Sequence, residues 1–140
     1  MNVTGPIRQI ILSNPAAFAL VGSRVYPVLI PKAATFPAVS LQVVSNLPSD
    51  TKSGVSTVDI IRLQVDSYAT TYATAAAVDE AVRGAIDKYA GTVNVTGSGI
   101  AASGQNFTIG GIRYETTQDI FEDQSEVFRL SSDYIVRLHR

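Results

Sequence analysis

Residues 61–89, IRLQVDSYATTYATAAAVDEAVRGAIDKY, contain the two patterns that decide the fold. Ile61, Leu63 and Val65 alternate with polar residues, which is typical of a β-strand with one buried face. From Thr71 to Tyr89 the apolar residues recur at helical spacing, and charged residues fill the opposite side. The stretch therefore predicts a half-buried strand followed by an amphipathic helix whose small residues allow it to pack closely on a sheet.

Further strands are predicted on both sides of this stretch. Residues 39–47 and 126–138 alternate between apolar and polar side chains, and 109–117 is a shorter strand candidate. Residues 24–26 predict a short edge strand, because the proline that follows cannot donate to a ladder. Strands that arrive as hairpin pairs favour an antiparallel sheet.

Helical signals precede these strands. Pro6 to Ser13 predicts a helix with Thr4 as its N-cap, and Asn14 caps a second turn or short helix that runs through Leu20. The predicted order is α–β–β–β–α–β–β, with the N-terminal helical residues taken as one unit. We expect an α+β fold, with a mostly antiparallel sheet and two helices packed on one of its faces.

Two polar segments interrupt the pattern. Residues 48–57 predict a long hairpin tip, and the Gly/Ser-rich residues 90–106 predict an exposed loop or a weak β-excursion. Both are too polar to join the core, so we expect them to face partner proteins. The residues that we expect to contact partners are Asp50, Lys52, Ser98, Ile100 and Gln105.

Length and composition exclude several classes of protein. The 140 residues favour a single domain, 1–140, and the absence of cysteine excludes disulfides and cysteine-based zinc sites. A net charge of −1 lacks the basic excess of proteins that bind nucleic acid through phosphates. We expect no signal peptide and no membrane span, because the first residues are polar and the apolar stretches are short.

One motif suggests nucleotide binding. Residues 97–102 match the G-x-G-x-x-A fingerprint, and Asp119 lies at the distance expected for a ribose contact. That function needs a helix that opens at the second glycine, but the following residues are β-type. Nucleotide binding through Gly97 and Gly99 therefore stays only a distant alternative to a plain loop.

Other catalytic and metal-binding patterns are weak. Ser49 and Lys52 have the spacing of a serine acylase, but they lie in the predicted hairpin tip and lack the companion motifs. His139 is the sole histidine, and the acidic residues between 119 and 126 lack the spacing of a calcium loop. We therefore predict no catalytic, cofactor-binding or metal-binding residue and no enzymatic activity.

Mixed charges are predicted on the sheet face opposite the core. Such residues either form a solvated face or a self-complementary subunit interface with arginine–carboxylate pairs. The residues concerned are Arg62, Asp66, Arg113, Glu115, Arg129, Asp133 and Arg137.

Several segments, in order, resemble the tail completion or tail terminator proteins of long-tailed bacteriophages. The likeness covers residues 18–138, although residues 97–104 match nothing in the family pattern. The segments are LVGSRVYP at 20–27, IPKAATFPAVS at 30–40, RLQVDSYA at 62–69, AVRGAI at 81–86 and FRLSSDYIV at 128–136.

The resemblance implies a structural virion protein at the head–tail junction, made in the bacterial host cytoplasm. Such a subunit forms a ring, usually a hexamer, that caps the completed tube of major tail protein and joins it to the head-completion or connector protein. DNA would pass through the lumen without specific binding, which suits the near-zero charge. The resemblance implies no cofactor, no catalytic residue and no membrane.

Two alternatives remain. A head-completion, connector or tail-tube subunit of the same particle would be distinguished by locating the chain in virions. A nucleotide-binding module or small-ligand enzyme would require tight binding that depends on Gly97 and Gly99.

Overall fold

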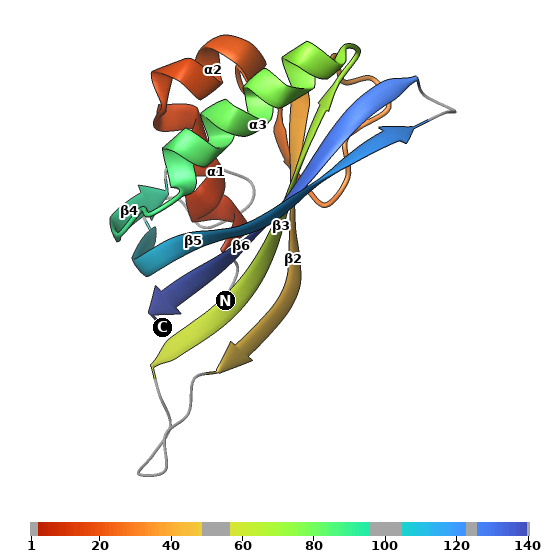
Figure 1. The fold of residues 1–140 in the computed structure, drawn as a ribbon. Coiled ribbons are helices and arrows are strands. Elements are labelled where there is room, and N and C mark those ends of the chain that lie inside the picture. Colours follow the sequence, from red (N-terminus) through yellow and green to blue (C-terminus); the bar gives the residue numbers. More distant parts are fainter. Residues whose placement is uncertain (1–2, 49–56, 96–104, 123–125, 140) are drawn as a thin grey trace.

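The computed structural model describes residues 3–48, 57–95, 105–122 and 126–139. Three helices and six strands lie within these residues (Figure 1). In chain order they are α1 (Thr4–Ser13), α2 (Pro15–Val21), β1 (Val25–Pro27), β2 (Ala38–Pro48), β3 (Val58–Ala69), α3 (Tyr72–Ile86), β4 (Gly91–Val95), β5 (Gln105–Glu122) and β6 (Val127–His139).

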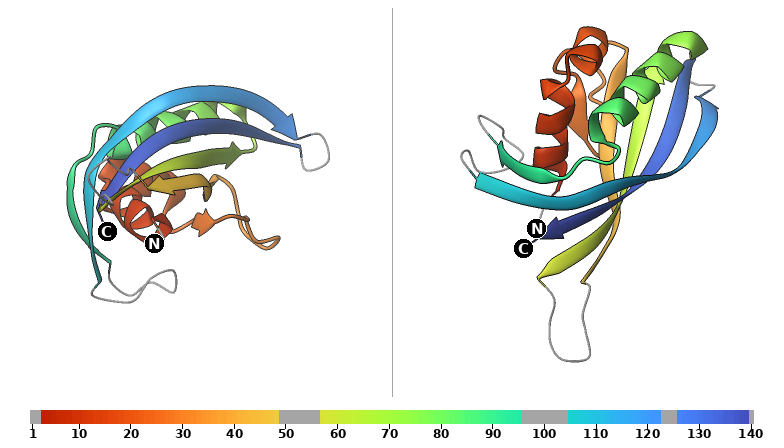
Figure 2. Two further views of the ribbon diagram at one scale, coloured as in Figure 1. Left: turned by 90° about the horizontal axis from the view of Figure 1, so that it is seen from below. Right: turned by 60° about the vertical axis from the view of Figure 1, so that its left-hand side comes forward.

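The six strands form one curled sheet in the order β1-β2-β3-β6-β5-β4. The sheet is mixed, because β1 runs parallel to β2 whereas the other four pairings are antiparallel. The helices lie together on its concave side, and the long strand β5 arches over them (Figure 2). The opposite, convex side is referred to below as the outer face.

The α+β class is confirmed, but the predicted order is wrong in three details. The N-terminal helical residues form two helices, so three helices are present in the described chain instead of two. The short edge strand β1 pairs in parallel, which its three residues did not reveal. Residues 91–95, left open as loop or weak β-excursion, form the edge strand β4 against the start of β5.

Alternation in β3 and β6 explains the layering of the fold. The two strands pair without interruption from Val58 opposite His139 to Ala69 opposite Phe128. Because side chains alternate between the faces of a strand, the apolar residues of both strands point to the helices. Leu63 lies opposite Tyr134, and both are fully buried. All nine elements contribute to this core.

Local signals set two of the three helix starts. The Asn14 side chain accepts a hydrogen bond from the backbone N–H of Ala17, and Thr71 accepts one from the N–H of Thr74. Both are N-caps of the usual kind. The expectation that Thr4 caps α1 is wrong, because Thr4 is already helical and Val3 occupies the cap position without a side-chain hydrogen bond. Val3 is instead buried in the core.

Matched leucine truncations test the position of this core. Leu63 is fully buried, whereas Leu29, which follows β1, is 76% exposed. We expect Leu63→Ala to lower the free energy of unfolding by about 2–5 kcal/mol, because it leaves a cavity. Leu29→Ala should change it by less than about 0.5 kcal/mol. Denaturant unfolding measures both, and equal losses would contradict the assignment.

Candidate interaction surface

The outer face gathers most of the predicted charged residues. Register places Arg62 and Arg113 on either side of Ile135, and Asp66 opposite Ser131, so these side chains share the face away from the helices. Arg129, Asp133 and Arg137 alternate with buried residues along β6 and lie on the same face. Glu115 lies at a register shift between Tyr114 and Thr116, beside Arg113.

Several of these charges pair within the molecule. Arg62 donates to Asp133 at 3.3 Å, and Arg113 donates to Glu115 at 3.0 Å. Asp66 is 4% exposed and accepts two hydrogen bonds from the Gln64 amide. The carboxylates of this face are therefore largely engaged, whereas the Arg113 side chain is 73% exposed and Arg137 is also exposed.

The same face contains a hollow of about 510 Å³ that the sequence analysis missed. Its signal was the adjacent pair Gly110-Gly111 inside a strand. A Cβ at Gly111 would meet no atom within 4 Å, whereas one at Gly110 would lie 2.9 Å from the His139 ring. The hollow thus combines an apolar floor with two arginines at its rim. Its lining residues are Ile60, Gly110, Gly111, Ile112, Arg113, Ile135 and Arg137.

The predicted partner-facing loops are only partly visible. Asp50, Lys52, Ser98 and Ile100 lie outside the described residues, as do the motifs at 97–102 and 49–52. Gln105 is the first residue of β5 and lies opposite Val95.

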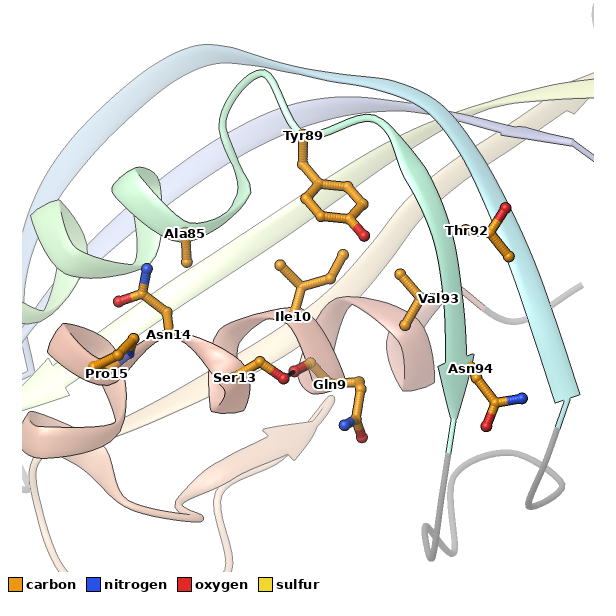
Figure 3. A pocket seen from close by; sticks show the side chains of 10 residues that line it. All are labelled: Gln9, Ile10, Ser13, Asn14, Pro15, Ala85, Tyr89, Thr92, Val93 and Asn94. Carbon is orange, nitrogen blue, oxygen red and sulfur yellow. Dashed lines mark hydrogen bonds between the residues drawn. The ribbon is translucent and has the colours of Figure 1, made fainter.

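A second hollow, of about 440 Å³, lies on the helical side (Figure 3). The end of α1, the end of α3 and strand β4 enclose it, with Ile10, Tyr89 and Val93 turned toward its interior. Its other side chains are uncharged. The Ser13 hydroxyl donates to the carbonyl of Gln9 at 2.8 Å. No acid–base or nucleophilic pair is present among the residues that line this hollow.

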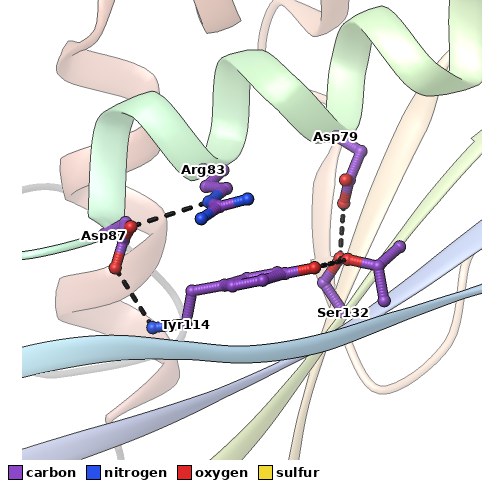
Figure 4. A network of polar contacts seen from close by, with 6 residues as sticks. Asp79, Arg83, Asp87, Tyr114 and Ser132 are labelled. Atoms are coloured by element: carbon purple, nitrogen blue, oxygen red, sulfur yellow. Dashed lines mark hydrogen bonds and ion pairs between the residues drawn. The ribbon is translucent and has the colours of Figure 1, made fainter.

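Polar contacts fasten α3 to the sheet (Figure 4). The Ser132 hydroxyl donates to Asp79 at 2.6 Å and contacts the Thr117 hydroxyl at 2.9 Å. At the end of α3, the Arg83 guanidinium lies 3.7 Å from the centroid of the Tyr114 ring. These contacts hold β5 and β6 against one helix, which orients the outer face behind them.

Burial raises the pKa of the Asp79 carboxyl. The hydrogen bond from Ser132 and the charge of Arg83 lower it by less, and the charge of Asp119 raises it further. Folding therefore shifts the ionisation equilibrium of Asp79 toward the protonated form. The pKa of Tyr134 is raised as well, mainly by burial.

The described residues contain no group of three or more His, Cys, Asp or Glu side chains that could hold a metal ion. Asp119, the possible ribose ligand, accepts a hydrogen bond from the Tyr72 hydroxyl at 3.1 Å. The strands that flank residues 96–104 pair antiparallel, which differs from the parallel strands of a dinucleotide-binding unit. Among the described helices, none is long and apolar enough to cross a membrane.

A model of the family described as tail completion protein gp17 matches residues 5–139. The chain belongs to this family. It is therefore a structural protein of a virion tail. No curated protein matches the chain.

The tail completion fold is also found in a solved virion. A chain of the structure titled "Virion of native gene transfer agent (GTA) particle" superimposes with a TM-score of 0.70 at 20% sequence identity. The match covers 99% of this tail completion protein and 95% of that chain. Likeness at this identity shows that the two chains share the fold.

The raised pKa of Asp79 predicts a pH-dependent stability. Because the folded state binds this proton more tightly than the unfolded state does, stability from Asp79 falls as pH rises from about 4 through the raised pKa. Asp79→Asn keeps an acceptor for Ser132 but never ionises. We expect the melting temperature of Asp79→Asn to exceed that of the wild type at pH 7, and the difference to shrink toward pH 4.

Asp79→Ala is the control, because it removes the acceptor and leaves Ser132 without that bond. It should be less stable than Asp79→Asn by about 1 kcal/mol. If the melting temperatures of the wild type and of Asp79→Asn depended on pH in the same way, a raised pKa of Asp79 would be contradicted.

Proposed function

We propose that this tail completion protein is a ring-forming tail terminator, which caps the completed tail tube and joins it to the head-side connector. The observation that carries the proposal is the family match over nearly the whole chain. The ring, the tube protein and the connector follow from the resemblance to tail terminators. We infer a hexamer and a position at the head–tail junction on the same basis.

Size and charge support a ring around DNA. A chain of 140 residues has a radius of gyration of about 14 Å, equivalent to a sphere about 37 Å across. Six such spheres in contact enclose a hole about one sphere wide, which exceeds the width of a duplex. A subunit with a net charge of −1 gives DNA little electrostatic grip, because binding through phosphates depends on many cationic contacts.

The outer face supplies a surface for the neighbouring subunit. Arg113 and Arg137 flank the hollow that Ile60 and Ile135 line. A buried apolar centre with an arginine-containing rim is the composition common in protein interfaces. We propose that these arginines contact carboxylates of a neighbouring subunit, and that Arg62, Asp66, Glu115, Arg129 and Asp133 belong to the same surface.

Light scattering and images of assembled tails test the ring. We expect a particle with the mass of about six subunits of 14.9 kDa, alone or after addition to tail tubes. Images should place it at the head-proximal end of the tail. A strict monomer that is absent from tail ends would contradict the proposal, and location within the tube or the head would favour the alternative structural roles.

Charge reversal tests the outer face. Arg137→Glu should weaken self-association at least about tenfold, because it places an acidic side chain where a carboxylate is expected. Lys32→Glu is a matched control, since Lys32 is exposed in the segment between β1 and β2. Sedimentation velocity measures both variants. Equal association of Arg137→Glu and the wild type would remove Arg137 from the interface.

A further inference from the structure

Among the described residues, no strand pairs with the second half of β2 on the side away from β3. On the side away from β3, β1 pairs only with Val39, Ser40 and Leu41. The following residues 42–48 are all exposed on the β2–β3 hairpin, which extends beyond the helices (Figure 1). A free edge of this kind is a template for another strand.

The sequence of this edge carries no charge, and its irregularities are Pro48 at its end and a register shift between Val43 and Ser45. Residues 38–48 contain no charged residue, and Val43, Val44 and Leu47 are 37%, 50% and 63% exposed. Soluble proteins normally place charges, especially lysine, on such strands to prevent association. An uncharged edge with exposed valine and leucine side chains is therefore available to another strand.

A second free edge belongs to β5, at the opposite edge of the sheet from β2. It lies toward the opposite end of the strands. β4 pairs only with Gln105 to Ile109 of β5, and the N–H of Lys88 donates to Ile112 beyond it. Past the register shift at Tyr114 and Thr116, no strand among the described residues pairs with this side of β5. One chain thus presents two free edges, each about seven residues long.

We propose that residues 42–48 of β2 pair antiparallel with residues 115–121 of β5 in a second copy of this chain, so that the sheet continues from subunit to subunit. This inference rests on the proposed ring, and it adds a contact between sheet edges to the outer-face contact proposed above. Two different surfaces that meet head to tail are what a cyclic oligomer with more than two subunits requires.

Strand directions agree with this junction. The antiparallel pairings from β2 through β3 and β6 to β5 make β2 and β5 run in opposite directions. If the ring axis runs roughly along the strands, rotation from one copy to the next leaves the direction of every strand unchanged. Strand β2 of one copy therefore meets β5 of the next copy in an antiparallel arrangement. Antiparallel pairs can form without a crossover connection.

Side-chain faces agree as well. Ser45 lies opposite Arg62, and Gln118 lies opposite Ser131, so both point to the outer face. With Ser45 paired to Gln118, the outer faces of the two copies become continuous. Asn46 then lies opposite Thr117, and both turn toward the helical side.

The edges are stepped so that they fit. β1 covers the start of β2, and β4 covers the start of β5, which leaves the distal half of each strand free. Through the pairs Ser45–Arg62, Arg62–Ile135 and Ile135–Arg113, Ser45 lies at the same height along the strands as Arg113. Gln118, its proposed partner in the next copy, is five residues further along β5 than Arg113. Because β5 has a register shift between Tyr114 and Thr116, this step corresponds to four residues of β6, from Ile135 to Ser131. The copies are therefore offset by about 13 Å over four strands about 19 Å wide, a tilt of about 35°, as in closed sheets.

Cysteine cross-linking tests the junction, because the chain has no cysteine of its own. We expect Ser45→Cys/Gln118→Cys to form a ladder of covalent oligomers under mild oxidation, both in solution and on assembled tails. The two residues of one chain lie on strands separated by two others, too far apart for an internal disulfide. Ser45→Cys/Thr108→Cys is the matched control, since β4 covers Thr108; it should form no ladder.

Lysine substitution gives an independent readout. Val44→Lys/Leu47→Lys should weaken self-association about tenfold or more while the melting temperature of the subunit stays unchanged, because both side chains are exposed. Phe18→Lys, at a 53% exposed position on α2, should associate like the wild type.

The outcomes separate the two proposals. A closed oligomer that yields no Ser45–Gln118 ladder and tolerates the lysines overturns the strand junction and leaves the ring intact. A chain that is monomeric in solution and on tails overturns both.

Discussion

The pairing of β3 with β6 is the interaction on which the rest of the structure depends. It runs without a register shift and joins the β1–β2 side of the sheet to the β5–β4 side. Its strict alternation places Leu63, Tyr134 and Val136 against the helices. Since a slip of one residue would exchange the two faces, this pairing also decides which charges reach the outer face.

The strongly periodic elements could be predicted from the sequence. β3, β6 and α3 each carry enough turns or alternations for the pattern to be decisive, and Asn14 gives a local cap signal for α2. β1 and β4 are short, and their pairing depends on strands elsewhere in the chain. Whether these strands form, and in which direction they pair, therefore depends on tertiary contacts, and the β-propensity of their own residues does not predict it.

The candidate surface was predictable as a face but not as a set of contacts. Alternation places Arg62 and Asp133 on the same side of the sheet, yet their ion pair joins residues 71 positions apart. The hollow at Gly110 and Gly111 depends on how β5 packs beside β6, and a pair of glycines by itself indicates only a weak point in a strand. The free edges likewise emerge only when the extent of β1 and β4 is known.

The position of β6 has a consequence for how the subunit is made. β6 follows every other described strand in the chain, yet it lies in the middle of the sheet. On the ribosome, β2 and β3 can form their hairpin early, but β5 and β3 have no common neighbour until β6 emerges. The pairs between β3 and β6 join residues 59 to 81 positions apart, from Ala69–Phe128 to Val58–His139, and such long-range pairing slows folding. The ribosome must therefore synthesise β6 before the subunit can fold. Only then can the subunit join a growing assembly.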